Sequence, residues 1–329
     1  MENKSIRVDV SEIKTYKSCR RQWLLSSRNR FHLRPMVTPA HFELGTIFHE
    51  ALAQLYLGVP VERVMEDVKK NMKDDSEVAL LAMIPGYARE VLPGDLDRFK
   101  VLDIEHHFEF VPADPETGEV IDADIEVCGS IDMIVLDPEE NAIYGFEHKT
   151  CKNFRDASYI WMDEQPRVYT YALKRYVEEY NAKQQMKWQQ EYEAVCRGEG
   201  VEPGDPGIIF RDPPQPVTLG GVYLNEVKKL LRQFQFSRTL CKYPEDDLKN
   251  FMYAFFGTCC ACHQSVATND PAYPSPSYMG CSMCDYKTIC ETYMYSTLDR
   301  DTVLAEFKEE FKVREVDHLE EKEDRSAAQ

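Results

Sequence analysis

One predicted β-hairpin carries the side chains best suited to chemistry. Its two extended segments, 125–136 and 142–150, are rich in β-branched residues and are separated by a turn sequence, Asp-Pro-Glu-Glu-Asn. If residues 138–141 form a four-residue loop, 137 faces 142, and the numbers of facing residues add up to 279. This register sets Asp132 opposite Glu147, with their Cβ atoms about 5 Å apart. The period of two puts Lys149 on the same face as Glu147.

Two carboxylates that face each other destabilise a sheet, so the arrangement calls for a cation or a solvent-exposed sheet end. Oxygen ligands suit Mg²⁺ or Mn²⁺, which can hold a phosphate and lower the pKa of a bound water. The ammonium of Lys149 could align that water or stabilise developing charge. Together these groups fit phosphodiester hydrolysis, although their spacing alone also fits an exposed hairpin with ordinary surface charges.

Helices are expected on both sides of the hairpin in the sequence. Apolar residues between Leu44 and Leu55 follow i, i+3, i+4, i+7 spacing and place His49 on the flank of the apolar stripe. Asp163 is a suitable N-cap for a later helix, in which Gln165 and Tyr169 share one face at i and i+4.

Four short motifs occur in a characteristic order: Gly45-Thr46-Ile47-Phe48-His49-Glu50-Ala51-Leu52, Gly129-Ser130-Ile131-Asp132, Phe146-Glu147-His148-Lys149-Thr150 and Gln165-Pro166-Arg167-Val168-Tyr169. Over roughly residues 10–295, this series resembles the RecB-type branch of the PD-(D/E)XK nuclease superfamily. The resemblance implies a restriction-endonuclease-like α/β core, in which a mixed sheet is flanked by helices.

The same resemblance implies a role for each motif residue. His49, Asp132, Glu147 and the main-chain carbonyl of His148 would bind Mg²⁺ or Mn²⁺, and Lys149 would be the catalytic lysine. The Gln165 and Tyr169 side chains would contact the DNA strand or buttress the site. No covalent enzyme intermediate is expected.

The sequence contains eleven cysteines, an odd number that fits metal ligation better than a complete disulfide framework. Cys281, Cys284 and Cys290, with a lone Cys19 upstream, resemble the iron-sulfur subgroup of RecB-type nucleases, such as AddB nuclease domains and the iron-sulfur exonucleases of CRISPR adaptation. That resemblance implies a [4Fe-4S] cluster that staples the N- and C-terminal segments together.

Spacing alone favours a different metal site. Cys259, Cys262, Cys281 and Cys284 have zinc-ribbon spacing, and a Zn²⁺ ion there would need neither of the other two cysteines. The cluster interpretation leaves Cys259, Cys260 and Cys262 unexplained. The remaining cysteines, at 128, 151, 196 and 241, are expected to be buried thiols.

The charge balance of the 329 residues is acidic, with 39 Lys plus Arg against 57 Asp plus Glu and a formal net charge of −18. This argues against a surface coated in basic residues, though not against a local basic groove. Basic residues do gather near the N-terminus, where aromatic side chains are interleaved, at Lys14, Lys17, Arg20, Arg21, Arg28, Arg30 and Arg34. Arg20 and Arg21 are expected to contact DNA, and a solvated helix face is the alternative.

The chain is predicted to contain a nuclease core at 1–240, a cysteine-rich metal-cluster segment at 241–295 packed on the core with Cys19, and an acidic tail at 296–329. Within the core, helices are expected at 11–30 and over parts of 61–99, and 181–216 reads as a polar insertion. A strand at about 217–227 should be followed by a helix that ends near Leu240.

The expected function is a Mg²⁺- or Mn²⁺-dependent deoxyribonuclease, an exonuclease on single-stranded ends that serves recombination, repair, replication or CRISPR-type adaptation. The alternative is a non-catalytic or partner-dependent DNA-binding subunit with a zinc ribbon. No phosphate-loop motif occurs, so a partner helicase or a recombination or adaptation protein would be a separate chain. The sequence begins with no signal peptide and has no run of about 18 apolar residues, so we expect a cytoplasmic protein without a membrane span.

Overall fold

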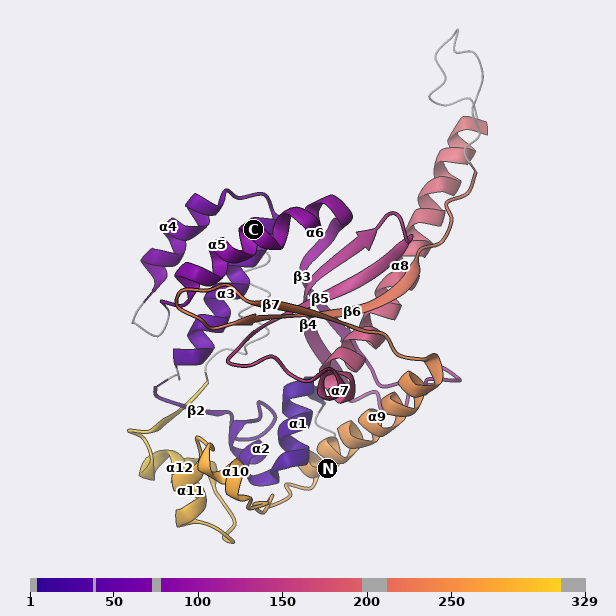
Figure 1. The fold of residues 1–329 in the computed structure, drawn as a ribbon. Helices are drawn as coiled ribbons and strands as arrows, with labels where there is room; N and C mark the ends of the chain where they lie inside the picture. The colour runs from indigo at the N-terminus through magenta and orange to yellow at the C-terminus, as the bar shows by residue number, and fades with distance from the viewer. Residues whose placement is uncertain (1–4, 38–39, 73–77, 197–211, 315–329) are drawn as a thin grey trace.

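The computed structural model describes residues 5–37, 40–72, 78–196 and 212–314. Its centre is a six-stranded mixed sheet in which neighbours follow the order β1-β4-β5-β6-β7 and β3 also pairs with β4 (Figure 1). The strands are β1 (Ile6–Val8), β3 (Lys100–Phe110), β4 (Ile125–Asp137), β5 (Ala142–Cys151), β6 (Thr218–Lys228) and β7 (Phe236–Cys241). The predicted α/β class with a mixed sheet flanked by helices is confirmed.

Strands β4 and β5 form the predicted hairpin. They are antiparallel, residues 138–141 form the loop, and the observed pairs from Asp137 with Ala142 to Met133 with Phe146 have the expected register. Strand β3 runs antiparallel to β4, whereas β6 runs parallel to β5. The site-bearing strand β5 is therefore held between two hydrogen-bonded neighbours.

Helices cover both faces of this sheet. One apolar core joins Phe48, Leu80 and Phe146, and its helices are α3 (Ala40–Tyr56), α4 (Val61–Asn71), α5 (Leu80–Glu90) and α6 (Leu92–Arg98). The other core joins Ile13, Leu173 and Phe256, and its helices are α1 (Val10–Ser18), α8 (Glu164–Cys196) and α9 (Glu245–Ala267). Figure 1 shows these two helical layers on opposite sides of the strands. The short helix α7 (Ala157–Met162) precedes α8, and α2 (Arg20–Ser26) follows α1.

Two predicted elements differ from those observed. The helix expected over 11–30 is interrupted at Cys19, whose extended backbone separates α1 from α2. The helix expected to end near Leu240 is wrong, because Phe236–Cys241 is a strand that pairs with β6, and the helix begins only at Glu245. Phe236 packs against one core of the sheet and Cys241 lies in the other, so tertiary contacts override the local pattern here.

Segments from the two ends of the chain pack together in a third apolar cluster, which includes Leu25, Leu33, Ile289, Val303 and Phe311. Strand β2 (Leu33–Pro35) pairs antiparallel with β8 (Phe311–Val313). The short helices of this region are α10 (Tyr278–Ser282), α11 (Lys287–Thr292) and α12 (Arg300–Glu306). The first part of the segment predicted as a tail thus contributes α12 and β8, while 315–329 lies outside the described residues. In the described part of the chain, no helix has the length and apolar character to cross a membrane.

Candidate functional site

The hairpin opens at the position of the candidate site. The ladder between β4 and β5 ends with Met133 and Phe146, one residue before the expected pair of Asp132 and Glu147. The main-chain N–H of His148 donates a hydrogen bond of 2.7 Å to Asp132 Oδ2. Both carboxylates are buried, at 7% exposure for Asp132 and 3% for Glu147. The structure thus brings two acidic side chains into the interior at the end of the hairpin.

Asp132 belongs to a group that could hold a metal ion. His49 on α3, Glu105 on β3 and Asp132 each offer one ligand atom, and these three atoms lie within 4.8 Å of one another. His49 Nδ1 lies 3.3 Å from Asp132 Oδ1. These residues, with His148, line a cavity of about 10 Å³, which has room for about one water-sized particle.

Glu105 is a candidate ligand that sequence reasoning missed. Its neighbours Ile104 and His106 pair with Met133 and Ile131, so the register of β3 sets Glu105 across from Asp132. Its φ of 52° is unusual for a residue other than glycine, and such backbone conformations cluster at functional sites. No sequence motif marks this position, and only the register of a third strand would have revealed it.

Glu147 is held by groups from its own strand and from α8. Lys149 forms an ion pair with Glu147 Oε1, and Gln165 Nε2 donates to the same oxygen at 2.9 Å. Gln165 Nε2 also donates to the hydroxyl of Tyr169, at 2.9 Å. Because Tyr169 is only 8% exposed, it offers little surface to a DNA strand and instead orients Gln165. The buttressing role is the one that this geometry favours.

The second carboxylate oxygen of Glu147, Oε2, is the atom that points to a metal ligand role. Oε2 is buried and has no hydrogen-bond partner among the described residues. A buried carboxylate oxygen left in this state is costly, and a divalent cation is a natural partner for it. The oxygen and imidazole donors gathered here are ligands that Mg²⁺ and Mn²⁺ accept. The residues therefore fit a hard divalent metal.

The electrostatics of the site also favour added positive charge. Burial, together with the nearby Asp132 carboxylate, raises the pKa of Glu147 above its usual range, despite the opposing charge of Lys149. Burial lowers the pKa of Lys149, but Glu147 and Asp132 outweigh it, so the pKa of Lys149 is raised and the side chain stays an ammonium. Likewise, burial opposes the charge on His49, and the Asp132 carboxylate outweighs it and raises the pKa of His49.

The His148 ring borders this cavity, with its centroid 6.2 Å from that of the candidate ligand His49. It packs near Tyr56, Tyr87 and Phe146, with ring centroids 6.0–6.3 Å away. Burial lowers the pKa of His148 to about 3, so its imidazole is neutral. The main-chain carbonyl of His148 stays the predicted metal ligand of this residue.

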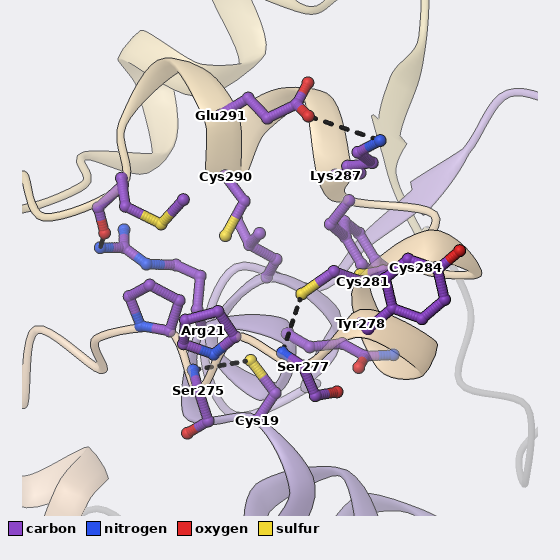
Figure 2. A pocket seen from close by; sticks show the side chains of 16 residues that line it. Cys19, Arg21, Ser275, Ser277, Tyr278, Cys281, Cys284, Lys287, Cys290 and Glu291 are labelled. Atoms are coloured by element: carbon purple, nitrogen blue, oxygen red, sulfur yellow. Dashed lines mark hydrogen bonds and ion pairs between the residues drawn. The ribbon is translucent and has the colours of Figure 1, made fainter.

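A second candidate site is formed by cysteines. Cys19, at the junction of α1 and α2, lines a cavity of about 320 Å³ together with Cys281, Cys284 and Cys290 (Figure 2). Two main-chain N–H groups point at these sulfurs, from Ser275 to Cys19 Sγ (3.5 Å) and from Ser277 to Cys281 Sγ (3.4 Å). Four cysteines from opposite ends of the chain thus share one cavity.

The four cysteines of the zinc-ribbon alternative do not line one cavity. Cys259 and Cys262 are fully buried on α9 in the apolar core beneath the sheet, and neither lines the cavity that contains Cys281 and Cys284. They are buried thiols, like Cys128 and Cys241. Of the three unexplained cysteines, Cys260 is also part of α9 and packs against the same core.

The basic residues near the N-terminus are mostly engaged within the protein. Ion pairs join Lys14 to Asp163 (2.5 Å), Lys17 to Glu164, Arg20 to Asp270 (3.1 Å) and Arg28 to Asp9 (3.0 Å). The predicted DNA contact by Arg21 is wrong, because this side chain is 1% exposed and lines the cysteine cavity. Arg20 keeps 45% of its side-chain surface exposed and remains a candidate for a DNA contact.

An α/β core that gathers carboxylates, an imidazole and an ammonium at the open end of a hairpin is an arrangement compatible with metal-assisted phosphodiesterases. A family model described as the PD-(D/E)XK nuclease superfamily matches residues 7–291. The chain therefore belongs to the PD-(D/E)XK nuclease superfamily, and this membership indicates a nuclease that hydrolyses phosphodiester bonds.

A search of curated proteins finds no match to this chain. Among solved structures, one titled "Crystal structure of SSO0001" is 12% identical, with 91% of this chain and 89% of that chain covered at a TM-score of 0.32. This likeness is too weak to bear on the fold or on the site.

Proposed function

We propose that this nuclease is a Mg²⁺- or Mn²⁺-dependent deoxyribonuclease that acts as an exonuclease on single-stranded ends. One observation carries the metal-dependent part of the proposal: the buried and unpartnered Oε2 of Glu147, close to the group formed by His49, Glu105 and Asp132. The preference for single-stranded DNA and for ends rests on the resemblance to RecB-type nucleases.

In this proposal His49, Asp132, Glu147 and the main chain of His148 hold the metal, and Glu105 is an additional ligand. The bound metal would lower the pKa of a water and polarise the scissile phosphate. The protein's own part is to hold the carboxylates in place. The main-chain N–H of His148 holds one oxygen of Asp132, and Gln165 holds one oxygen of Glu147.

Lys149 acts as a cation and not as a base. Its raised pKa keeps it protonated at neutral pH, so it cannot take a proton from water. About 36% of its side chain is exposed, whereas its partner Glu147 is buried, so Lys149 connects the buried carboxylate with the surface. Beside Glu147 it can align an attacking water or stabilise charge on the phosphate.

The cysteine cavity would hold a [4Fe-4S] cluster through Cys19, Cys281, Cys284 and Cys290. Four thiolates are the usual ligand set of such a cluster, and N–H donors to the sulfurs, such as those of Ser275 and Ser277, are a common feature of its surroundings. A cavity of about 320 Å³ exceeds what a single zinc ion needs, because four Zn–S bonds of about 2.3 Å bring the sulfurs close together. The cluster would be structural, because its ligands join α1 and α2 to the C-terminal segment.

A partner chain completes the proposal. A helicase, or another recombination or adaptation protein, would deliver the strand in the cytoplasm, and residues 296–329 would contact it. Part of that segment, 315–329, lies outside the described residues. Recovery of a partner with the full chain, and its loss when 315–329 is deleted, is the expected result of a pull-down.

The test of catalysis uses DNA labelled at the 5′ or the 3′ end, linear or circular and single- or double-stranded, with Mg²⁺, Mn²⁺ or EDTA. We expect metal-dependent loss of linear single strands, with circular single strands left intact. Glu147→Ala and Lys149→Ala should both abolish cutting. Intact circles would distinguish an exonuclease from an endonuclease, and a metal-loaded protein that cuts no DNA would refute the proposed activity.

A further inference from the structure

A buried arginine lines the cysteine cavity without an acidic partner. Arg21 is 1% exposed, and its Nη2 donates to the main-chain oxygens of Ser296 (2.9 Å) and Met294 (3.4 Å). Its Nε and Nη1 are buried and have no hydrogen-bond partner among the described residues. Within the described part of the chain, the guanidinium therefore has only carbonyl oxygens as hydrogen-bond partners.

No described carboxylate lies close enough to form an ion pair with Arg21. The acidic residue that lines the same cavity, Glu291, pairs instead with Lys287 at 3.5 Å. Arg21 instead shares the cavity with Cys19, Cys281, Cys284 and Cys290. Figure 2 shows Arg21 on the side of the cavity where Cys19 and Cys290 lie, with Cys281 and Cys284 farther across.

A buried cation without a counter-ion is strongly unfavourable. The cluster of the proposed function would supply the missing anion, because four thiolates around an oxidised [4Fe-4S] core of charge +2 leave a net charge of about −2. One-electron reduction makes this net charge about −3, with no change at Arg21, which stays protonated. A fixed positive charge beside the cluster therefore favours the reduced state over the oxidised one.

We propose that Arg21 is the buried counter-charge of the metal–thiolate cluster, and that it sets the reduction potential of the cluster and slows its loss. Arg21 is thus a positioning and electrostatic residue, and not a ligand. The inference rests on the proposed [4Fe-4S] site and adds a residue that belongs neither to the ligand set nor to the nuclease site.

The test compares Arg21→Gln with Arg21→Lys in anaerobically purified protein that contains its cluster. Both variants alter the hydrogen bonds to the carbonyls of Met294 and Ser296, but only Arg21→Gln removes the charge. We expect the midpoint potential, followed by absorbance during titration with dithionite, to fall in Arg21→Gln and to stay near that of the unchanged protein in Arg21→Lys. Loss of iron to a chelator should be faster in Arg21→Gln by about tenfold, the equivalent of one charge-assisted interaction.

The matched control is Arg20→Gln. This arginine is the neighbour of Arg21 on α2, is 45% exposed and pairs with Asp270, so its loss should change neither the potential nor the rate of iron loss. Equal effects of Arg21→Gln and Arg21→Lys would show a role in packing alone and overturn the counter-charge. An unchanged potential in Arg21→Gln would overturn it as well.

Metal analysis separates this failure from failure of the proposed cofactor. If the unchanged protein contains iron and sulfide and only the Arg21 variants disagree, the inference alone is wrong. If the protein contains zinc, or no metal at the cysteines, both the proposed cluster and the role of Arg21 are wrong. The proposed nuclease site is not tested by this result. Should Arg21→Gln not fold, the potential of Arg21→Lys still decides, because a large fall with the charge retained contradicts a purely electrostatic role.

Discussion

Replacing Glu147 with Gln tests the metal site by a measurement that does not require DNA. The substitution keeps the size of the side chain and removes its charge. At a Mn²⁺ concentration about a hundredfold above the dissociation constant, binding should stabilise the unchanged protein by about 2.7 kcal/mol. For a domain of this size, each kcal/mol shifts the melting temperature by roughly 2–4 °C, so Mn²⁺ should raise it by about 5–10 °C.

In Glu147→Gln this increment should nearly disappear. Mutation of a residue that only hydrogen-bonds to a metal ligand lowers metal affinity about 10- to 100-fold. Loss of a charged ligand itself should therefore lower it about 100-fold or more. At the same Mn²⁺ concentration the stabilisation then falls to about 0.4 kcal/mol, which is about 1 °C. Without metal, the variant should melt no lower than the unchanged protein, because burial and Asp132 disfavour the ionised form of Glu147, as its raised pKa shows.

Glu226→Gln is the matched control. Glu226 is a buried carboxylate on the neighbouring strand β6 and pairs with Arg155 at 2.9 Å, outside the metal-binding group. Its replacement should lower the melting temperature with and without Mn²⁺ and leave the increment intact. Differential scanning calorimetry gives all of these values. A full increment in Glu147→Gln would refute Glu147 as a metal ligand, and a lost increment in Glu226→Gln would show that the effect is not specific to the site.

Three further predictions concern the fold and the cysteines. Arg238→Met should lower the free energy of unfolding by about 3–5 kcal/mol in urea titrations, because it leaves the buried Asp95 carboxylate without the guanidinium that binds it at 2.8 Å; an effect below 1 kcal/mol would contradict this. Burial raises the pKa of Glu12 from 4.5 to about 7, so stability present below pH 4.5 should decline by up to about 3 kcal/mol as pH rises to about 7. Glu12→Gln should flatten that decline, and a decline of equal size in the variant would exclude Glu12 as its source. Cys284→Ser should remove iron from the purified protein while Cys262→Ser retains it, and iron loss in the second variant alone would overturn the proposed ligand set.

The hairpin could be predicted from the sequence because its information is local. The alternation of side chains and a four-residue turn determine the register of β4 and β5, and the observed pairs agree with it. Strand β7 could not be predicted in the same way. Its six residues lie at the edge of the sheet, and their pairing with β6 depends on contacts that no local pattern records.

Long-range pairing also explains the errors about charge. The basic residues of α1 and α2 looked like a surface for a DNA strand, but their partners Asp163, Glu164 and Asp270 lie 147–250 residues away in the sequence. The burial of Arg21 against the C-terminal segment is likewise a property of the folded chain. Residue type and spacing suggested which side chains could do chemistry, and only the tertiary structure shows which charges are already neutralised.

Helix α1 connects the two candidate sites. Cys19, directly after this helix, lines the cysteine cavity, and Lys14 within it pairs with Asp163 at 2.5 Å. Asp163 accepts a hydrogen bond from the main-chain N–H of Gln165, whose side chain holds Glu147. A partly exposed ion pair contributes at most about 1 kcal/mol, so the lysine alone cannot fix the helix against α8. The packing of α1 against α8 and α9 supplies the rest. If Cys19 ligates the proposed cluster, loss of that cluster should also disturb the carboxylate of Glu147.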